Sequence, residues 1–169
     1  MVMSEATLAA TGPRPVLRIE RHLSDPIDVV WNALTEPVAM RSWFPTRIEI
    51  DGWKIGATLM HHFDDYEIGP VPGSVLEWDP LRRVRFTWDV DTITFELTPA
   101  PEGGTVFVLT EELRASHAAR NAAGRDGCLD RLQFARETES WTTRFNRYSV
   151  VFEAVLGPQE GPPEILNLS

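Results

Sequence analysis

The chain has 169 residues, 43% of them hydrophobic, and carries 16 Lys and Arg against 25 Asp and Glu. One domain is the expectation at this length, with a core large enough to fold without disulfides or metals. A net charge of -9 argues against binding to nucleic-acid phosphates or anionic lipid headgroups. The single cysteine, Cys128, excludes an intrachain disulfide and a cysteine-based zinc cage.

The sequence contains no targeting or membrane signal. Residues 1–16 have neither the basic nor the apolar region of a signal peptide, and no apolar run approaches the ~20 residues of a membrane span. We therefore expect a cytoplasmic protein without a membrane span. Residues 1–13 are small and polar without a period, which predicts a disordered N-terminal arm.

The first third of the chain mixes strand and helix patterns. Over residues 16–23, Leu17, Ile19 and Leu23 share one parity, which is typical of a strand with one buried face. Two short helices and then two more strands are predicted over residues 27–34, 37–44, 46–51 and 57–63.

The clearest pattern is a hairpin over residues 73–88. Apolar residues alternate with Arg and Thr along its second strand, and Asp79-Pro80 supplies the turn. Two further strands are predicted over residues 92–98 and 105–113. The total of about seven strands joined by short turns predicts an antiparallel meander.

The pattern changes to helical after Leu113. Apolar residues at helical spacing predict a long helix over residues 116–136 and an amphipathic helix over residues 141–152. The apolar stripe of the second helix is either part of the core or the face of a homodimer. The Pro-rich tail, residues 158–169, either frays or lies over a neighbouring element.

Several motifs resemble those of one superfamily. The matching segments are Ile27-x-x-Val30-Trp31-x-x-Leu34-Thr35-x-Pro37, Trp43-Phe44, Gly73-x-Val75-Leu76-Glu77-x-Asp79-Pro80, Arg82-Arg83-Val84-x-Phe86-Thr87-Trp88, Gly104-Thr105 and Gly124-x-x-x-Cys128-Leu129-x-x-Leu132. Together they are similar to the START-like superfamily, also called SRPBCC. Within it, the chain resembles the bacterial branch related to heat-shock-protein-90 ATPase activator homologues.

This resemblance implies an α+β helix-grip fold, in which a curved antiparallel sheet of about seven strands surrounds the long C-terminal helix. The START-like domain would span residues 14–136, and residues 137–157 would add a C-terminal amphipathic helix. The resemblance also implies a cavity for an apolar or aromatic small molecule between sheet and helix. Where the family often has Gly-Trp near the start of the long helix, this chain has Gly124-Arg125.

Two charged residues fall on apolar faces. Glu111 shares its parity with Phe107 and Leu109, and Arg125 lies on the apolar stripe of the helix expected to cover them. A buried charge is tolerated when it is paired. Either Arg125 anchors a ligand carboxylate or phosphate while Glu111 orients it, or the two form an internal ion pair, or Arg125 reaches out to solvent.

Other chemistry has less support in the sequence. His61 and His62 are neighbours on a strand and point to opposite faces, so we expect no metal site there and interpret them as surface residues at a strand end. Phosphate-binding, dinucleotide-binding and serine-nucleophile motifs are absent from the sequence, and no cofactor is expected. We interpret Cys128 as a small buried hydrophobe rather than a reactive thiolate.

We therefore predict a protein that binds an apolar or aromatic small molecule, and favour binding over catalysis without deciding whether it is an enzyme. The side chains that we expect around the ligand are Trp43, Phe44, Trp53, His62, Glu77, Trp88, Phe95, Phe107, Glu111 and Arg125. Two alternatives stay open. One is a polyketide cyclase or dehydratase in which Glu77, Glu111 or His62 performs acid–base catalysis, and the other is a module that binds a chaperone partner through its acidic surface.

Overall fold

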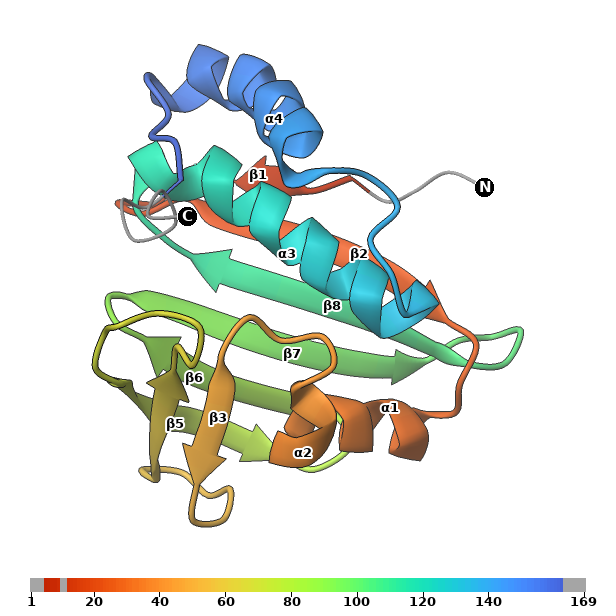
Figure 1. The fold of residues 1–169 in the computed structure, drawn as a ribbon. Helices are drawn as coiled ribbons and strands as arrows, with labels where there is room; N and C mark the ends of the chain where they lie inside the picture. Colours follow the sequence, from red (N-terminus) through yellow and green to blue (C-terminus); the bar gives the residue numbers. More distant parts are fainter. Residues whose placement is uncertain (1–4, 10–11, 163–169) are drawn as a thin grey trace.

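The computed structural model describes residues 5–9 and 12–162, and its dominant feature is one curved antiparallel sheet against which a long helix, α3, is packed (Figure 1). The strands are β1 (Thr7–Ala9), β2 (Val16–Leu23), β3 (Arg47–Ile50), β4 (Thr58–His62), β5 (Val71–Asp79), β6 (Arg83–Trp88), β7 (Asp91–Pro99) and β8 (Thr105–Glu112). Their order across the sheet is β1-β2-β8-β7-β6-β5-β4-β3.

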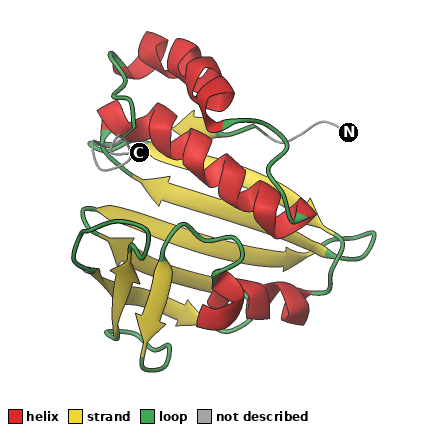
Figure 2. Cartoon of the chain, in the orientation of Figure 1, coloured by secondary structure: helices red, strands yellow, loops and turns green. Residues whose placement is uncertain are grey.

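The helices lie at two places along this sheet (Figure 2). They are α1 (Ile27–Thr35), α2 (Pro37–Met40), a short 3₁₀ turn η1 (Ala115–His117), α3 (Ala118–Phe134) and α4 (Trp141–Leu156). Of the first two, α2 lies beside β3 and α1 lies next to α2 near β7, whereas α3 crosses β2 and β8 and carries α4 on its outer side. The predicted helix-grip fold is thus confirmed, with one strand more than expected. Among the described residues, no helix combines the length and apolar character needed to cross a bilayer.

The additional strand is β1, which lies inside the segment that we expected to be a disordered arm. It pairs with β2 through Thr7 and Arg18, and the Ala6 amide donates a hydrogen bond of 3.0 Å to the Tyr148 hydroxyl. Three residues are too few to show a period, so sequence alternation could not reveal this strand. The remainder of the expected arm at residues 1–4 and 10–11, and the tail at residues 163–169, lie outside the described residues.

The alternation in the last strand places a carboxylate in the core. Every second residue of β8 is buried, from Thr105 to Glu111. In the register of the sheet, Glu111 lies between Leu17 on β2 and Ile93 on β7, both fully buried. The predicted position of Glu111 on the buried face of this strand is therefore confirmed.

The β5–β6 hairpin also forms as its sequence predicts. The Arg82 amide donates a hydrogen bond of 3.0 Å to the Asp79 carbonyl across the turn. Gly73 on β5 is required by a close approach, because a Cβ at this position would lie 2.1 Å from the carbonyl oxygen of Thr87.

The helices α3 and α4 pack through two kinds of contact. The small buried residues of α3 let the helix approach the sheet closely; they are Ala118, Ala119, Ala122 and Ala123. On α4, Tyr148 and Phe152 are buried, so this half of the apolar stripe belongs to the core, whereas Trp141 and Phe145 are only partly buried.

A polar cluster is buried where α4 meets α3 and β2. Asp130 of α3 accepts hydrogen bonds from Arg21 of β2 at 3.0 Å and from Arg144 of α4. Asp126, one turn earlier on α3, pairs with Arg21 and accepts a bond from the Tyr148 hydroxyl. All five residues are at most 5% exposed, so they link the three elements inside the protein rather than on its surface.

Candidate functional site

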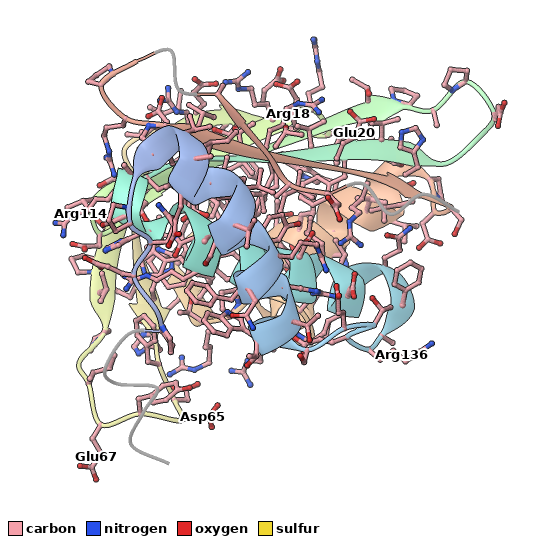
Figure 3. The ribbon with its side chains drawn as sticks, turned by 90° about the horizontal axis from the view of Figure 1, so that it is seen from above. Arg18, Glu20, Asp65, Glu67, Arg114 and Arg136 are labelled. Atoms are coloured by element: carbon pink, nitrogen blue, oxygen red, sulfur yellow. The ribbon has the colours of Figure 1, made fainter. Side chains whose placement is uncertain are left out.

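A pocket of about 550 Å³ opens between the first half of α3 and the turn joining β6 to β7. The loop after β4 contributes Phe63 and Tyr66, the segment before α4 contributes Glu137, and the first residue of α4 contributes Trp141. Figure 3 shows Arg114, at the start of the helical segment, and the loop bearing Asp65 and Glu67 along the same side of the molecule. Four elements distant in sequence thus meet around one hollow.

The walls of the pocket are aromatic. Its lining includes the rings of Phe63, Tyr66, Trp88 and Trp141. Tyr66 is 40% exposed, while the other three rings are half-buried. Such a lining suits a flat apolar molecule, because aromatic side chains provide large apolar contact surfaces with defined geometry.

Arg125 forms part of the wall beside Trp88. Its guanidinium carbon lies 4.8 Å from the centre of the Trp88 ring, a cation–π contact. Its Nε donates to Glu111 Oε2 at 2.8 Å and its Nη2 donates to Glu111 Oε1 at 3.0 Å. Burial alone would lower the pKa of Arg125, but the adjacent Glu111 carboxylate outweighs it and raises the pKa, so the guanidinium stays charged.

Asn121 connects this pair to a second carboxyl group. Asn121 lies one turn before Arg125 on α3. The Asn121 Nδ2 donates to Glu111 Oε1 at 3.0 Å and to Asp91 Oδ2 at 3.4 Å. Asp91 lines the pocket and is paired with Arg14 at 2.9 Å. Burial, and then the nearby charge of Glu111, raise the pKa of Asp91 to about 6. Asp91 therefore changes its charge within the physiological pH range.

Behind Trp88 lies a buried histidine. The His61 ring stacks on the indole with centroids 4.8 Å apart and planes inclined by 11°. Its Nδ1 is 3.1 Å from Thr46 Oγ1 and its Nε2 is 3.2 Å from the Thr87 carbonyl oxygen. Burial lowers the pKa of His61 to about 4, so the ring is neutral at pH 7. The interpretation of His61 as a surface residue was wrong, because its parity places it on the inner face of β4.

Basic residues of α3 and of the turn before it complete the lining. They are Arg114, His117, Arg120 and Arg131. Arg131 pairs with Glu137 at 2.6 Å and also donates to the Trp43 carbonyl at 3.1 Å. Cys128 faces the same region, where burial raises the pKa of its thiol and disfavours the thiolate.

The structure brings only part of the expected ligand set together. Trp88 and Arg125 line the pocket, and Glu111 stands directly behind Arg125. Four aromatic residues instead pack against one another in the core and are not part of the pocket lining: Trp43, Phe44, Phe95 and Phe107.

The other three expected residues lie away from the pocket. Trp53 stacks on Trp78 at 5.4 Å and donates its indole N–H to the Thr35 carbonyl. His62 pairs with Glu49 at 2.8 Å, as expected for a surface residue. The Glu77 side chain is 41% exposed and forms an ion pair with Arg83 at 2.7 Å. Within the described ranges, no group of three His, Cys, Asp or Glu residues is arranged to hold a metal ion.

Sequence reasoning missed several lining residues. Asn121 precedes Arg125 by four residues, so helical spacing could have placed them on one face. Tyr66 comes from an irregular loop, and Trp141 is the first residue of α4; only the tertiary fold brings the two to the pocket. Asp91 is the first residue of β7 and shares its parity with the buried Ile93 and Phe95, so strand alternation could have placed it on the inner face.

Comparison with known proteins agrees with this architecture. A family model described as "Activator of Hsp90 ATPase homolog 1-like protein" matches residues 25–135. A search of curated protein sequences finds no match.

Solved structures of similar fold come from several bacteria. EF2215 of Enterococcus faecalis, a conserved protein of unknown function, is 20% identical and superposes with a TM-score of 0.77, covering 89% of this chain and 91% of its own. The crystal structure of CalU16 from Micromonospora echinospora has 20% identity and a TM-score of 0.70, over 89% of this chain and 99% of that one. CV1439 from Chromobacterium violaceum has 21% identity and a TM-score of 0.56, over 73% and 99%.

At these identities the structural likeness concerns the fold alone. The family model, however, covers more than half of the 169-residue chain, and the motifs quoted from the sequence lie within or next to the matched segment. The chain belongs to the family of Activator of Hsp90 ATPase homolog 1-like proteins.

Proposed function

We propose that this protein binds a small molecule with a flat apolar or aromatic body in the pocket between α3 and the β6–β7 turn. The observation that carries the proposal is the combination of a volume of about 550 Å³ with four aromatic rings in the lining. Pockets of roughly 300–1,000 Å³ lined by apolar side chains with a few polar groups are the usual size and character of small-molecule sites.

Polar groups of the pocket would orient the bound molecule. Two guanidinium nitrogens of Arg125 are hydrogen-bonded to Glu111, and its third, Nη1, has no hydrogen-bond partner among the described residues. The Glu111 pair holds the Arg125 plane against Trp88, and Nη1 is the donor left for a ligand. On this proposal Glu111 positions Arg125 and does not itself touch the ligand.

Gly124 offers a direct test of where the ligand binds. It lines the pocket in the middle of α3, and a Cβ added to it would meet no atom within 4 Å. Alanine and leucine at this position both favour the helix over glycine by about 0.8–1 kcal/mol. The two replacements thus stabilise α3 similarly but fill the pocket to different extents.

The experiment is a fluorescence titration with N-phenyl-1-naphthylamine, a neutral aromatic probe. We expect the wild type and Gly124→Ala to bind it and Gly124→Leu to bind at least about tenfold more weakly, since overfilling a packed site costs about 1–3 kcal/mol. Thermal denaturation of all three variants serves as the control, with both replacements as stable as the wild type or more so. Equal binding by the alanine and leucine variants would contradict the proposal.

Family membership favours a second candidate function, a module that acts on a chaperone of the Hsp90 class. The test is the ATP hydrolysis rate of a purified Hsp90-class chaperone with and without this protein at low salt, where contacts made by its acidic surface are strongest. An increased rate would support this function. An unchanged rate over a wide excess of this protein would count against it.

A further inference from the structure

The end of the pocket where the helical segment begins is basic, although the chain as a whole carries a net charge of -9. Arg114, His117 and Arg120 all belong to the lining there. Arg114 is exposed, and no acidic side chain of the described residues lies within ion-pair distance of it. This mouth of the pocket therefore has positive charge that the surrounding residues do not fully neutralise.

A carboxylate of the same chain already contacts this basic group. Glu160, four residues beyond the end of α4, places its Oε2 2.9 Å from His117 Nε2 and 3.6 Å from Arg120 Nη1. The arrangement shows which chemical group these residues accept: a single anionic oxygen shared between an imidazole and a guanidinium.

The backbone around Glu160 is held in place by separate contacts. The Glu160 amide donates to the Ser116 carbonyl at 2.8 Å. Gln159 accepts from the Ala119 amide at 2.9 Å and donates to the Ala115 carbonyl at 2.9 Å. Because none of these bonds involves the Glu160 carboxylate, the carboxylate can leave the basic group while the segment stays attached.

The carboxylate is held weakly compared with the buried pairs. The Glu160 side chain is 58% exposed, whereas the Arg125–Glu111 pair is at most 10% exposed. Burial, together with Arg120, lowers the pKa of His117, so its ring is mainly neutral at pH 7. Exposed ion pairs contribute little stability, and an anion from solution can replace one.

We propose that Arg114, His117 and Arg120 form an anion subsite at the mouth of the pocket, that Glu160 occupies this subsite in the absence of ligand, and that an aromatic acid displaces it. The inference rests on the proposed function and names its ligand class, a molecule with a flat apolar body and one carboxylate or sulfonate. The body would lie between the aromatic walls and the acid would replace the Glu160 carboxylate.

Two fluorescent probes with the same ring system test the inference. N-phenyl-1-naphthylamine is neutral, and 8-anilinonaphthalene-1-sulfonate carries one sulfonate on the same skeleton. We expect Glu160→Gln to bind the sulfonate probe at least about threefold more tightly than the wild type, because an exposed competing ion pair is removed. Binding of the neutral probe should be unchanged, and Arg120→Gln should weaken the sulfonate probe alone.

Glu102→Gln is the matched control, since it removes the same charge from the exposed turn between β7 and β8, at the end of these strands remote from Asp91. It should alter neither probe. If the neutral probe binds and the preference for the sulfonate probe is the same in Glu160→Gln and the wild type, the anion subsite is wrong while the pocket proposal stands. If the wild type binds neither probe, the proposed function itself fails, and the subsite fails with it.

Discussion

Arg125 and Glu111 form a two-point ion pair inside the protein, with Arg125 Nε 2.8 Å from one carboxylate oxygen and Nη2 3.0 Å from the other. Glu111 comes from the last strand and Arg125 from the middle of α3. Neither charge is accessible enough to be solvated alone. The pair therefore fixes how α3 lies on the sheet and, through the Trp88 contact, shapes one wall of the pocket.

Replacing Glu111 by Gln should show how much the Arg125–Glu111 pair contributes to the stability of the folded protein. The substitution leaves a buried guanidinium without a countercharge, and we expect a loss of about 3–5 kcal/mol in the free energy of unfolding. Urea denaturation measures this loss. The double variant Glu111→Gln with Arg125→Met removes both charges and should recover a large part of the stability. A loss below about 0.5 kcal/mol in the single variant would show that Arg125 turns to solvent instead.

Asp91 should make stability depend on pH in an unusual direction. Because the folded protein raises the pKa of Asp91 to about 6 from 3.8, the folded state binds the proton more tightly than the unfolded state. This contribution is present below pH 3.8 and is lost as the pH rises through 6, by at most about 3 kcal/mol.

The measurement is the difference in Tm between Asp91→Asn and the wild type at pH 5 and pH 8. Asparagine cannot ionise, so the variant does not lose stability as the pH rises through 6. The Tm of the variant relative to that of the wild type should therefore be higher at pH 8 than at pH 5. The ion pair with Arg14 is absent from the variant at both pH values, so its loss mainly changes the part of the Tm difference that does not depend on pH. A difference that is the same at both pH values, or reversed, would mean that Asp91 ionises normally.

Arg144 of α4 should control stability in acid. Burial would raise the pKa of Asp130, but hydrogen bonds from Thr138, Arg144 and Arg21 lower it to about 2. A depressed carboxyl pKa contributes stability above pH 3.8 that is lost as the pH falls toward 2. Arg144, one of these donors, is only 1% exposed. Arg144→Met removes its hydrogen bond to Asp130.

We expect this variant to lose about 2–4 kcal/mol at pH 7, since a buried partner charge is left less well paired. Its acid unfolding, followed by circular dichroism, should occur at a higher pH than that of the wild type. Arg147→Met is the matched control, because Arg147 lies on the same helix and pairs with the partly exposed Glu139. Equal acid unfolding in the two variants would contradict the role of the buried cluster.

The sequence predicted the framework of the fold well, because alternation and helical spacing report directly on which face is buried. The parity of β8 located Glu111, and the stripe of α3 located Arg125 opposite it. Arg21 has the same parity as Leu17, Ile19 and Leu23, so its burial was also readable from the sequence and was overlooked. Asp126 and Asp130 are four residues apart on α3, a spacing that places two acids on one face.

The pocket was much less predictable. Phe95 and Trp88 both follow strand alternation, yet one is enclosed in the core and the other lines the hollow. The difference depends on the curvature of the sheet and on loops that reach over its edge, and neither has a periodic signal. Tyr66 lies in an irregular loop, and although helical spacing and strand parity place Trp141 and Asp91 on inner faces, only the folded chain shows that they border a pocket.

The six tryptophans provide the most direct measurement of whether the pocket is the binding site. Trp88 and Trp141 line it, whereas Trp43 and Trp53 donate their indole N–H groups to backbone carbonyls elsewhere at 2.8 and 2.7 Å. The measurement is the nuclear magnetic resonance spectrum of the six indole N–H signals during titration with N-phenyl-1-naphthylamine. We predict that the signals of Trp88 and Trp141 shift progressively to saturation while those of Trp43 and Trp53 stay in place. Shifts at Trp43 and Trp53 with none at Trp88 and Trp141, or no shift at any of the six, would contradict the account.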